Sequence, residues 1–88
     1  MKIKSVLVSG GAGFIGAHLV RALVARGIEV GVVEREGADF WRVKDLTGKF
    51  KTYSVDLRDT AAVSAAVSDF RPDAVYHLAT YYAVDHRP

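Results

Sequence analysis

The sequence predicts an α/β fold in which four parallel strands and three helices form part of a doubly wound sheet. One observation behind this prediction is that apolar runs of strand length alternate with amphipathic runs of helical length. The other is that the first apolar run passes directly into a glycine cluster and then into a helical run. Such an alternation gives parallel strands with right-handed crossovers, helices on both faces and the strand order 3-2-1-4.

The first strand and the first helix have clear patterns. A strand is expected over residues 3–8, and its near-continuous apolar character indicates burial on both faces. A helix is expected over residues 13–26, with Gly27 as its C-terminal stop. The apolar residues that recur four positions apart on this helix, and that are expected to face the sheet, are Ile15, Leu19 and Leu23.

The middle of the chain contains the second strand and the least clearly patterned segment. The strand is expected over residues 28–33 and is closed by Glu34. In residues 37–49 a short amphipathic helix bounded by glycines is expected. Its apolar residues are Phe40, Trp41, Val43 and Leu46.

The third strand and third helix follow in the same order. The strand is expected over residues 51–55. The helix is expected to be capped by Asp59 or Thr60 and to end at Arg71, which precedes a proline. The residues of its apolar face are Ala62, Val63, Ala66, Val67 and Phe70.

The fourth strand is expected over residues 73–79, and residues 80–88 carry no regular pattern. A sheet that stopped at this strand would leave an open edge, which a second copy of the chain could cover in a homodimer. The favoured interpretation is instead that residues 1–88 are the N-terminal part of a longer domain whose further strands cover that edge.

Length and composition limit the class of protein. The 88 residues allow at most one domain, and no second domain is expected. The net charge of +2 comes from basic and acidic residues spread along the chain, which argues against nucleic acid as a partner. The absence of cysteine excludes disulfides and thiol nucleophiles, and the separated histidines predict no metal site. Without a signal-peptide core or a membrane-length apolar run, we expect a soluble, cytoplasmic protein.

The glycine cluster over residues 10–16 predicts an anion site made of backbone atoms. It matches G-x-G-x-x-G through Gly11, Gly13 and Gly16, or a wider spacing that starts at Gly10. The first glycine permits a tight turn, the second lets a ligand approach the backbone, and the third lets the helix pack against the strand. A pyrophosphate is the usual occupant of such a helix N-terminus.

An acidic residue at the right distance extends this prediction to a dinucleotide. Glu34 stands 18 residues after Gly16, where a carboxylate can accept hydrogen bonds from the ribose hydroxyls of adenosine. A carboxylate would repel the 2′-phosphate of NADP, so NAD is expected and NADP is the less favoured cofactor. Arg35 could pair with such a phosphate, or it could be a solvated surface arginine.

Four segments are expected at the carboxyl ends of the strands, which is the ligand-binding edge of a doubly wound sheet. They are residues 10–16, Glu34, Asp56 and residues 78–80. Trp41 could stack on an adenine there, but a packing role in the core or at a domain edge is the favoured interpretation.

The motif Ser9-Gly10-Gly11-Ala12-Gly13-Phe14-Ile15-Gly16 resembles the T-G-G-x-G-F-I-G fingerprint of the extended short-chain dehydrogenases/reductases, the NAD-dependent epimerase/dehydratase family. The resemblance extends over the whole chain, implies a Rossmann-type fold and selects the wider glycine spacing. It implies cofactor-binding roles for Gly10, Gly13, Phe14, Ile15, Gly16, Glu34, Arg35, Asp56, Leu57, Leu78, Ala79 and Thr80. Within this set, Asp56 and Leu57 match a pair that contacts adenine, and Leu78 to Thr80 match a segment near the nicotinamide half.

The resemblance implies a parent enzyme that acts by hydride transfer between NAD and a nucleotide sugar. Family members carry a catalytic Tyr-x-x-x-Lys pair, but no tyrosine of this chain has lysine four residues later. No catalytic residue is therefore assigned, and it stays open whether this chain alone is an enzyme. The alternative function is a self-contained, non-catalytic dinucleotide-binding or sensor module.

Overall fold

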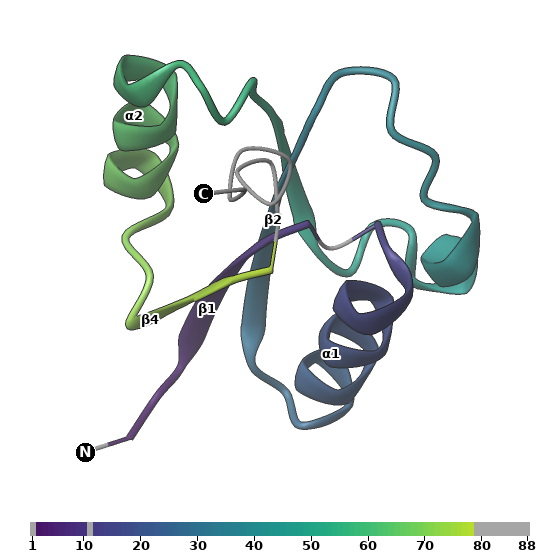
Figure 1. Ribbon diagram of the computed structural model, residues 1–88. Coiled ribbons are helices and arrows are strands. Elements are labelled where there is room, and N and C mark those ends of the chain that lie inside the picture. Colours follow the sequence, from purple (N-terminus) through teal and green to yellow (C-terminus); the bar gives the residue numbers. More distant parts are fainter. Residues whose placement is uncertain (1, 11, 79–88) are drawn as a thin grey trace, which may run out of the picture.

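The computed structural model describes residues 2–10 and 12–78, and these form a single parallel sheet with helices on both faces (Figure 1). The strands lie in the order β3-β2-β1-β4, which confirms the predicted topology. Their bounds are Ser5–Ser9 for β1, Glu29–Glu34 for β2, Lys51–Ser54 for β3 and Ala74–His77 for β4. The helices are α1 at Phe14–Ala25, the short 3₁₀ helix η1 at Trp41–Leu46 and α2 at Thr60–Phe70.

The central strand β1 is buried on both faces, as predicted from its apolar run. Val6 and Val8 belong to the core on the side of α1 and η1, whereas Leu7 belongs to the core on the side of α2. The strand is shorter than expected, because Ile3 precedes it and is 44% exposed. Alternation of side chains along one strand therefore supplies both layers of the core.

Helix α1 faces the sheet through Leu23 and Leu19, as predicted, but its first turn does so through residues other than Ile15. The residues that it buries are Gly16, Ala17, Val20 and Leu23. Ile15 was expected to face the sheet, but its side chain is 69% exposed. Because Gly16 and Ala17 occupy the contact with the sheet at the first turn, the preceding residue is rotated away from it. The predicted C-terminal stop is confirmed by Gly27, whose φ of 76° is left-handed.

The short helix predicted within residues 37–49 is present as the 3₁₀ helix η1, Trp41–Leu46. Val43 is its buried residue, and the backbone of Val43 (φ −124°, ψ 27°) departs from helical geometry. Trp41 is 61% exposed, with the guanidinium of Arg42 4.5 Å from the ring centroid, so it is not part of the core. Arg21 of α1 fixes η1 in place through its ion pair with Asp45 at 2.7 Å.

Helix α2 begins and ends as its sequence predicted. The carboxylate of Asp59 caps it by accepting a hydrogen bond from the N–H of Ala62 at 3.1 Å. Arg71, with a left-handed φ of 55°, ends it. Phe70 packs over Gly31 in β2, where a Cβ would come within 2.9 Å of the ring. None of the described helices is long and apolar enough to cross a membrane.

Candidate functional site

The candidate site lies at the carboxyl ends of the parallel strands, where the glycine loop leaves β1 for α1 (Figure 1). The N–H of Gly10 donates to the carbonyl oxygen of Val33 at 3.0 Å, which ties the start of the loop to β2. On the other side, the N–H of Leu78 donates to the carbonyl oxygen of Ser9 at 2.9 Å. The ends of three strands are therefore fixed around the loop.

The backbone of the glycine loop makes an open helix N-terminus. Gly10 adopts a φ of 86°, a conformation that favours glycine, and its carbonyl oxygen accepts from the N–H of Gly13 at 3.2 Å. Gly13 is the N-cap of α1, and no side chain caps the helix within the part of the chain that the structure describes. The first-turn N–H groups and the positive end of the helix dipole are thus available to an anion.

Gly10 and Gly13 are glycines for different reasons. At Gly13 the backbone is extended (φ −75°, ψ 176°), which any residue can adopt. A Cβ there would meet only the carbonyl oxygen of Gly10, at an ordinary 3.6 Å. The fold itself therefore does not require glycine at position 13. The missing side chain instead leaves the backbone accessible, as a pyrophosphate in this position requires.

Glu34 and Arg42 hold the loop from two sides at Ala12. The Oε2 atom of Glu34 accepts from the N–H of Ala12 at 3.1 Å, and Nη1 of Arg42 donates to the Ala12 carbonyl oxygen at 3.3 Å. Oε1 of Glu34 also accepts from the N–H of Arg35 at 3.2 Å. A carboxylate has about four lone-pair positions, so Glu34 keeps acceptor capacity for a ligand hydroxyl.

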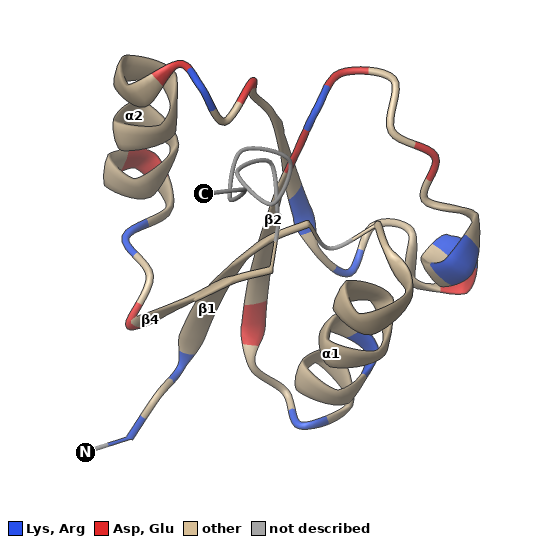
Figure 2. Cartoon of the chain, viewed as in Figure 1, with Lys and Arg blue, Asp and Glu red and all other residues tan. Residues whose placement is uncertain are grey.

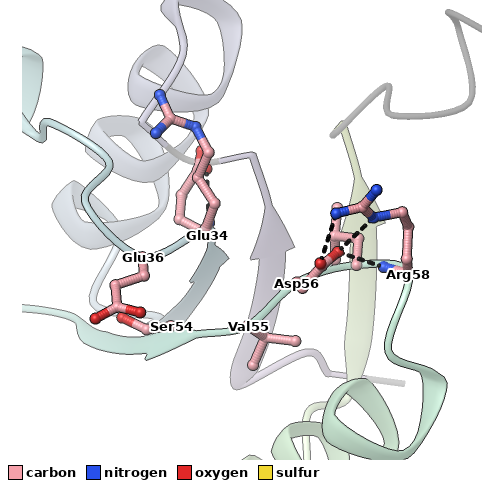
Figure 3. A pocket seen from close by; sticks show the side chains of 8 residues that line it. Glu34, Glu36, Ser54, Val55, Asp56 and Arg58 are labelled. Carbon is pink, nitrogen blue, oxygen red and sulfur yellow. Dashed lines mark hydrogen bonds and ion pairs between the residues drawn. The ribbon is translucent and has the colours of Figure 1, made fainter.

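A pocket of about 580 Å³ opens beside Glu34, between the segments that leave β2 and β3 (Figure 3). It is lined by Glu34, Arg35, Glu36, Ser54, Val55, Asp56, Leu57 and Arg58. Figure 2 shows acidic and basic residues alternating along these two segments, whereas the strand interiors carry few charges. The pocket thus combines an apolar surface from Val55 and Leu57 with charged groups of both signs.

Asp56 and Arg58 form an ion pair within this pocket (Figure 3). Oδ1 of Asp56 accepts from the backbone N–H and the Nε of Arg58, at 2.9 and 3.1 Å. Oδ2 accepts from Nη2 of Arg58 at 2.9 Å. The hydrogen bonds from the Arg58 side chain and backbone lower the pKa of Asp56 to about 2, so this carboxylate is ionised at neutral pH.

The pocket brings together four of the residues predicted for the site, Glu34, Arg35, Asp56 and Leu57. The glycines lie next to it through the contact between Ala12 and Glu34. Phe14 and Ile15 extend exposed side chains from the first turn of α1, and only their backbone belongs to the loop. Leu78 lies beside Ser9, while Ala79 and Thr80 are outside the described residues.

Trp41 does not lie at the pocket beside Glu34. It lines a second hollow of about 270 Å³ with Phe14, Ala17, His18, Arg21 and Arg42. Within residues 2–10 and 12–78, no group of three or more metal-ligating side chains could hold a metal ion.

Sequence reasoning missed several members of the site. Glu36, Ser54, Val55 and Arg58 line the pocket, and Arg42 contacts the glycine loop. Glu36 and Arg58 each follow a predicted site residue by two positions, so the sequence did contain a local indication of them. Arg42 is brought to Ala12 by the packing of η1 on α1, which no spacing in the sequence indicates.

The chain is similar to a known family of proteins over nearly its whole length. The family model described as "NAD dependent epimerase/dehydratase family" matches residues 6–87. UDP-glucose 4-epimerase 2 of Arabidopsis thaliana is 42% identical over 89 residues, an alignment that covers 92% of this chain and 25% of that protein.

Solved structures give the same result. The UDP-glucose 4-epimerase of Thermus thermophilus in complex with NAD has 39% identity and a TM-score of 0.74, covering 93% of this chain and 27% of its own. The UDP-glucose 4-epimerase of Thermotoga maritima with UDP-glucose has 31% identity and a TM-score of 0.75, covering 92% and 26%. The chain spans about a quarter of the length of these relatives.

Proposed function

Since the chain belongs to the NAD-dependent epimerase/dehydratase family, we propose that it binds the adenosine and pyrophosphate half of NAD at the carboxyl edge of its sheet. The observation that carries this proposal is the uncapped N-terminus of α1 behind Gly13, with the Glu34 carboxylate 3.1 Å from the same loop. A backbone anion site beside a carboxylate suits a pyrophosphate that is linked to a ribose.

The pyrophosphate would lie on the backbone of the glycine loop. Gly10 makes the turn, Gly13 lets the phosphate oxygens approach, and the first-turn amides, which include those of Phe14, Ile15 and Gly16, donate to them. The ribose would lie against Glu34, whose remaining acceptor positions suit its two hydroxyls. In these roles the protein orients the cofactor and supplies no proton.

The adenine would occupy the pocket between the segments that follow β2 and β3. Its volume of about 580 Å³ is in the range of small-molecule sites. Val55 and Leu57 offer apolar contact for the base, and Asp56 offers an ionised acceptor. Leu78, Ala79 and Thr80 would line the path toward the nicotinamide half, next to Ser9.

NAD is favoured over NADP by the charges around the ribose. Glu34 and Glu36 both line the pocket, so a 2′-phosphate bound there would be repelled by their carboxylates. Arg35, which stands between these two residues in the sequence, is a cation that could offset part of their repulsion of a 2′-phosphate.

For the whole protein, we propose an NAD-dependent epimerase of nucleotide sugars. The similarity to UDP-glucose 4-epimerases over more than nine-tenths of this chain supports this activity. NAD, when bound, supplies the hydride acceptor and donor for such a reaction. The 88 residues hold and orient the cofactor, while the acid/base pair expected of the family is not among them.

The second candidate is a dinucleotide-binding module without catalytic activity, for which the backbone anion site beside Glu34 would be equally suited. The test uses the longest natural protein that contains these 88 residues, titrated with NAD and NADP and then incubated with UDP-glucose. NAD binding with conversion to the 4-epimer supports the epimerase. NAD binding without conversion of any nucleotide sugar supports the module, and failure to bind NAD contradicts both.

A further inference from the structure

Arg58 occupies most of the acceptor capacity of Asp56. Three donors of Arg58, its backbone N–H, Nε and Nη2, bond to the two carboxylate oxygens within 3.1 Å. A carboxylate offers about four lone-pair positions. Two donors converge on Oδ1 and one reaches Oδ2, so one acceptor position remains on Oδ2.

This ion pair faces a ligand pocket, which distinguishes it from an ordinary surface pair. Asp56 and Arg58 both line the 580 Å³ pocket, and Leu57 between them lines it as well (Figure 3). The side chain of Arg58 is 64% exposed and that of Asp56 is 54% exposed, and an ion pair as exposed as this contributes little to folding stability. The two-pronged geometry does, however, restrict the direction in which the carboxylate points.

We propose that Arg58 is a specificity-determining positioning residue that presents Asp56 with a single acceptor site, and thereby selects a 6-amino purine over a 6-oxo purine. The inference rests on the proposed function, in which the pocket holds the base of NAD. A 6-amino group donates a hydrogen bond to the free position on Oδ2. A 6-oxo group places a second acceptor against that free position, so that neither the 6-oxo oxygen nor the free position of Oδ2 receives a hydrogen bond from the other.

The test compares the affinity for NAD with that for nicotinamide hypoxanthine dinucleotide. This analogue differs from NAD in having a 6-oxo group in place of the 6-amino group of the purine, and a proton on the adjacent ring nitrogen. It uses the longest natural protein that contains this chain and takes the ratio of the two dissociation constants. Wild type is expected to prefer NAD, and Arg58→Gln to reduce that preference about three- to tenfold, because the carboxylate is freed to rotate and hydrate. Arg58→Lys keeps the charge but not the two prongs, so it is expected to reduce the preference too.

Arg35→Gln is the matched control, since it removes the same charge from the same pocket. The guanidinium of Arg35 makes no hydrogen bond to Asp56 among the described residues, so both affinities should change by a common factor and leave the ratio as in wild type. The proposal would be overturned if the ratio of the two dissociation constants in Arg58→Gln stayed within about twofold of the wild-type ratio. It would also be overturned if Arg58→Lys kept the wild-type ratio. Failure of the wild-type protein to bind NAD would instead overturn the proposed function.

Discussion

The glycine loop and the neighbouring pocket are two halves of one candidate site, and they are built in different ways. The loop presents backbone N–H groups, and its shape depends on a left-handed Gly10 and an open Gly13. The pocket presents side chains from two separate crossovers, among them Glu34 and Asp56. The loop should therefore be sensitive to added side-chain volume, whereas the pocket should be sensitive to the position and sign of individual charges.

The largest effect is expected from Gly13→Val. A Cβ at this position fits the free protein but projects where phosphate oxygens must approach, so NAD affinity should fall about 100-fold or more, equivalent to two charge-assisted hydrogen bonds. The free energy of unfolding should change by about 1 kcal/mol or less. Calorimetric titration and thermal melting measure the two quantities.

Gly48→Val is the matched control for that substitution. Gly48 precedes β3 at the opposite edge of the sheet, with a φ of 87° and open space around it. A valine there is strained, so stability should fall by about 1 kcal/mol or more while NAD affinity is unchanged. If both variants bound NAD like wild type, the pyrophosphate would not lie on the loop.

Glu34→Ala tests the residue that joins the loop to the pocket. It removes the acceptor of the ribose hydroxyls and the contact with Ala12. We expect NAD affinity to fall about tenfold and the preference for NAD over NADP to narrow, because a repulsive charge is lost. Glu36→Ala removes an equal charge from the same pocket but no contact with the loop, and should change NAD affinity by less than about threefold. Equal behaviour of the two variants would remove Glu34 from the ribose site.

Arg42→Gln tests how far side chains preorganise the loop. Its guanidinium donates to the Ala12 carbonyl oxygen at 3.3 Å, a long contact, so we expect NAD affinity to fall only about threefold. Amide hydrogen exchange should become faster at Ala12. Lys44→Gln, an exposed substitution in the same short helix, is the control and should leave both quantities unchanged. An unchanged exchange rate in Arg42→Gln would show that the loop holds its own shape.

The smallest effect is expected on folding stability at neutral pH from the Asp56–Arg58 pair, since both of its side chains are more than half exposed. Since the pKa of Asp56 is lowered from 3.8 to about 2 in the folded state, the pair favours folding above pH 3.8, and this contribution is lost as the pH falls toward 2. Carboxyl-carbon NMR should give a midpoint near 2 in wild type and closer to 3.8 in Arg58→Gln. A midpoint near 3.8 in both proteins would contradict the ion pair.

The difference between loop and pocket also explains what the sequence could predict. Strand order and the glycine loop follow from short-range patterns, an apolar strand, spaced glycines and an amphipathic helix, and the structure confirms the topology. The exposure of Ile15 was mispredicted because periodicity does not fix which residue of a first turn meets the sheet. A core position of Trp41 was also mispredicted, since its ring lies at the surface under Arg42. Its position at a domain edge stays a prediction.

The pocket was predicted less completely for a physical reason. Glu34 and Asp56 were predicted as site residues because each lies at the carboxyl end of a strand, but the contacts that position the loop beside them come from elsewhere in the structure. Arg42 reaches the loop because η1 packs on α1, where Val43 is buried and Arg21 bonds to Asp45 and to the carbonyl oxygen of Arg42. Such tertiary contacts depend on packing and leave no periodic trace in the sequence.

Competition between the two halves of NAD tests the central claim most directly. In the longest natural protein that contains this chain, NAD is displaced by ADP-ribose or by nicotinamide mononucleotide, with wild type and Gly13→Val compared. If this chain holds adenosine and pyrophosphate, ADP-ribose should bind within about tenfold of NAD, and nicotinamide mononucleotide about 100-fold more weakly. Gly13→Val should weaken the binding of ADP-ribose about 100-fold or more, as it does that of NAD. Equal displacement by the two halves, or undiminished ADP-ribose binding by Gly13→Val, would contradict the account.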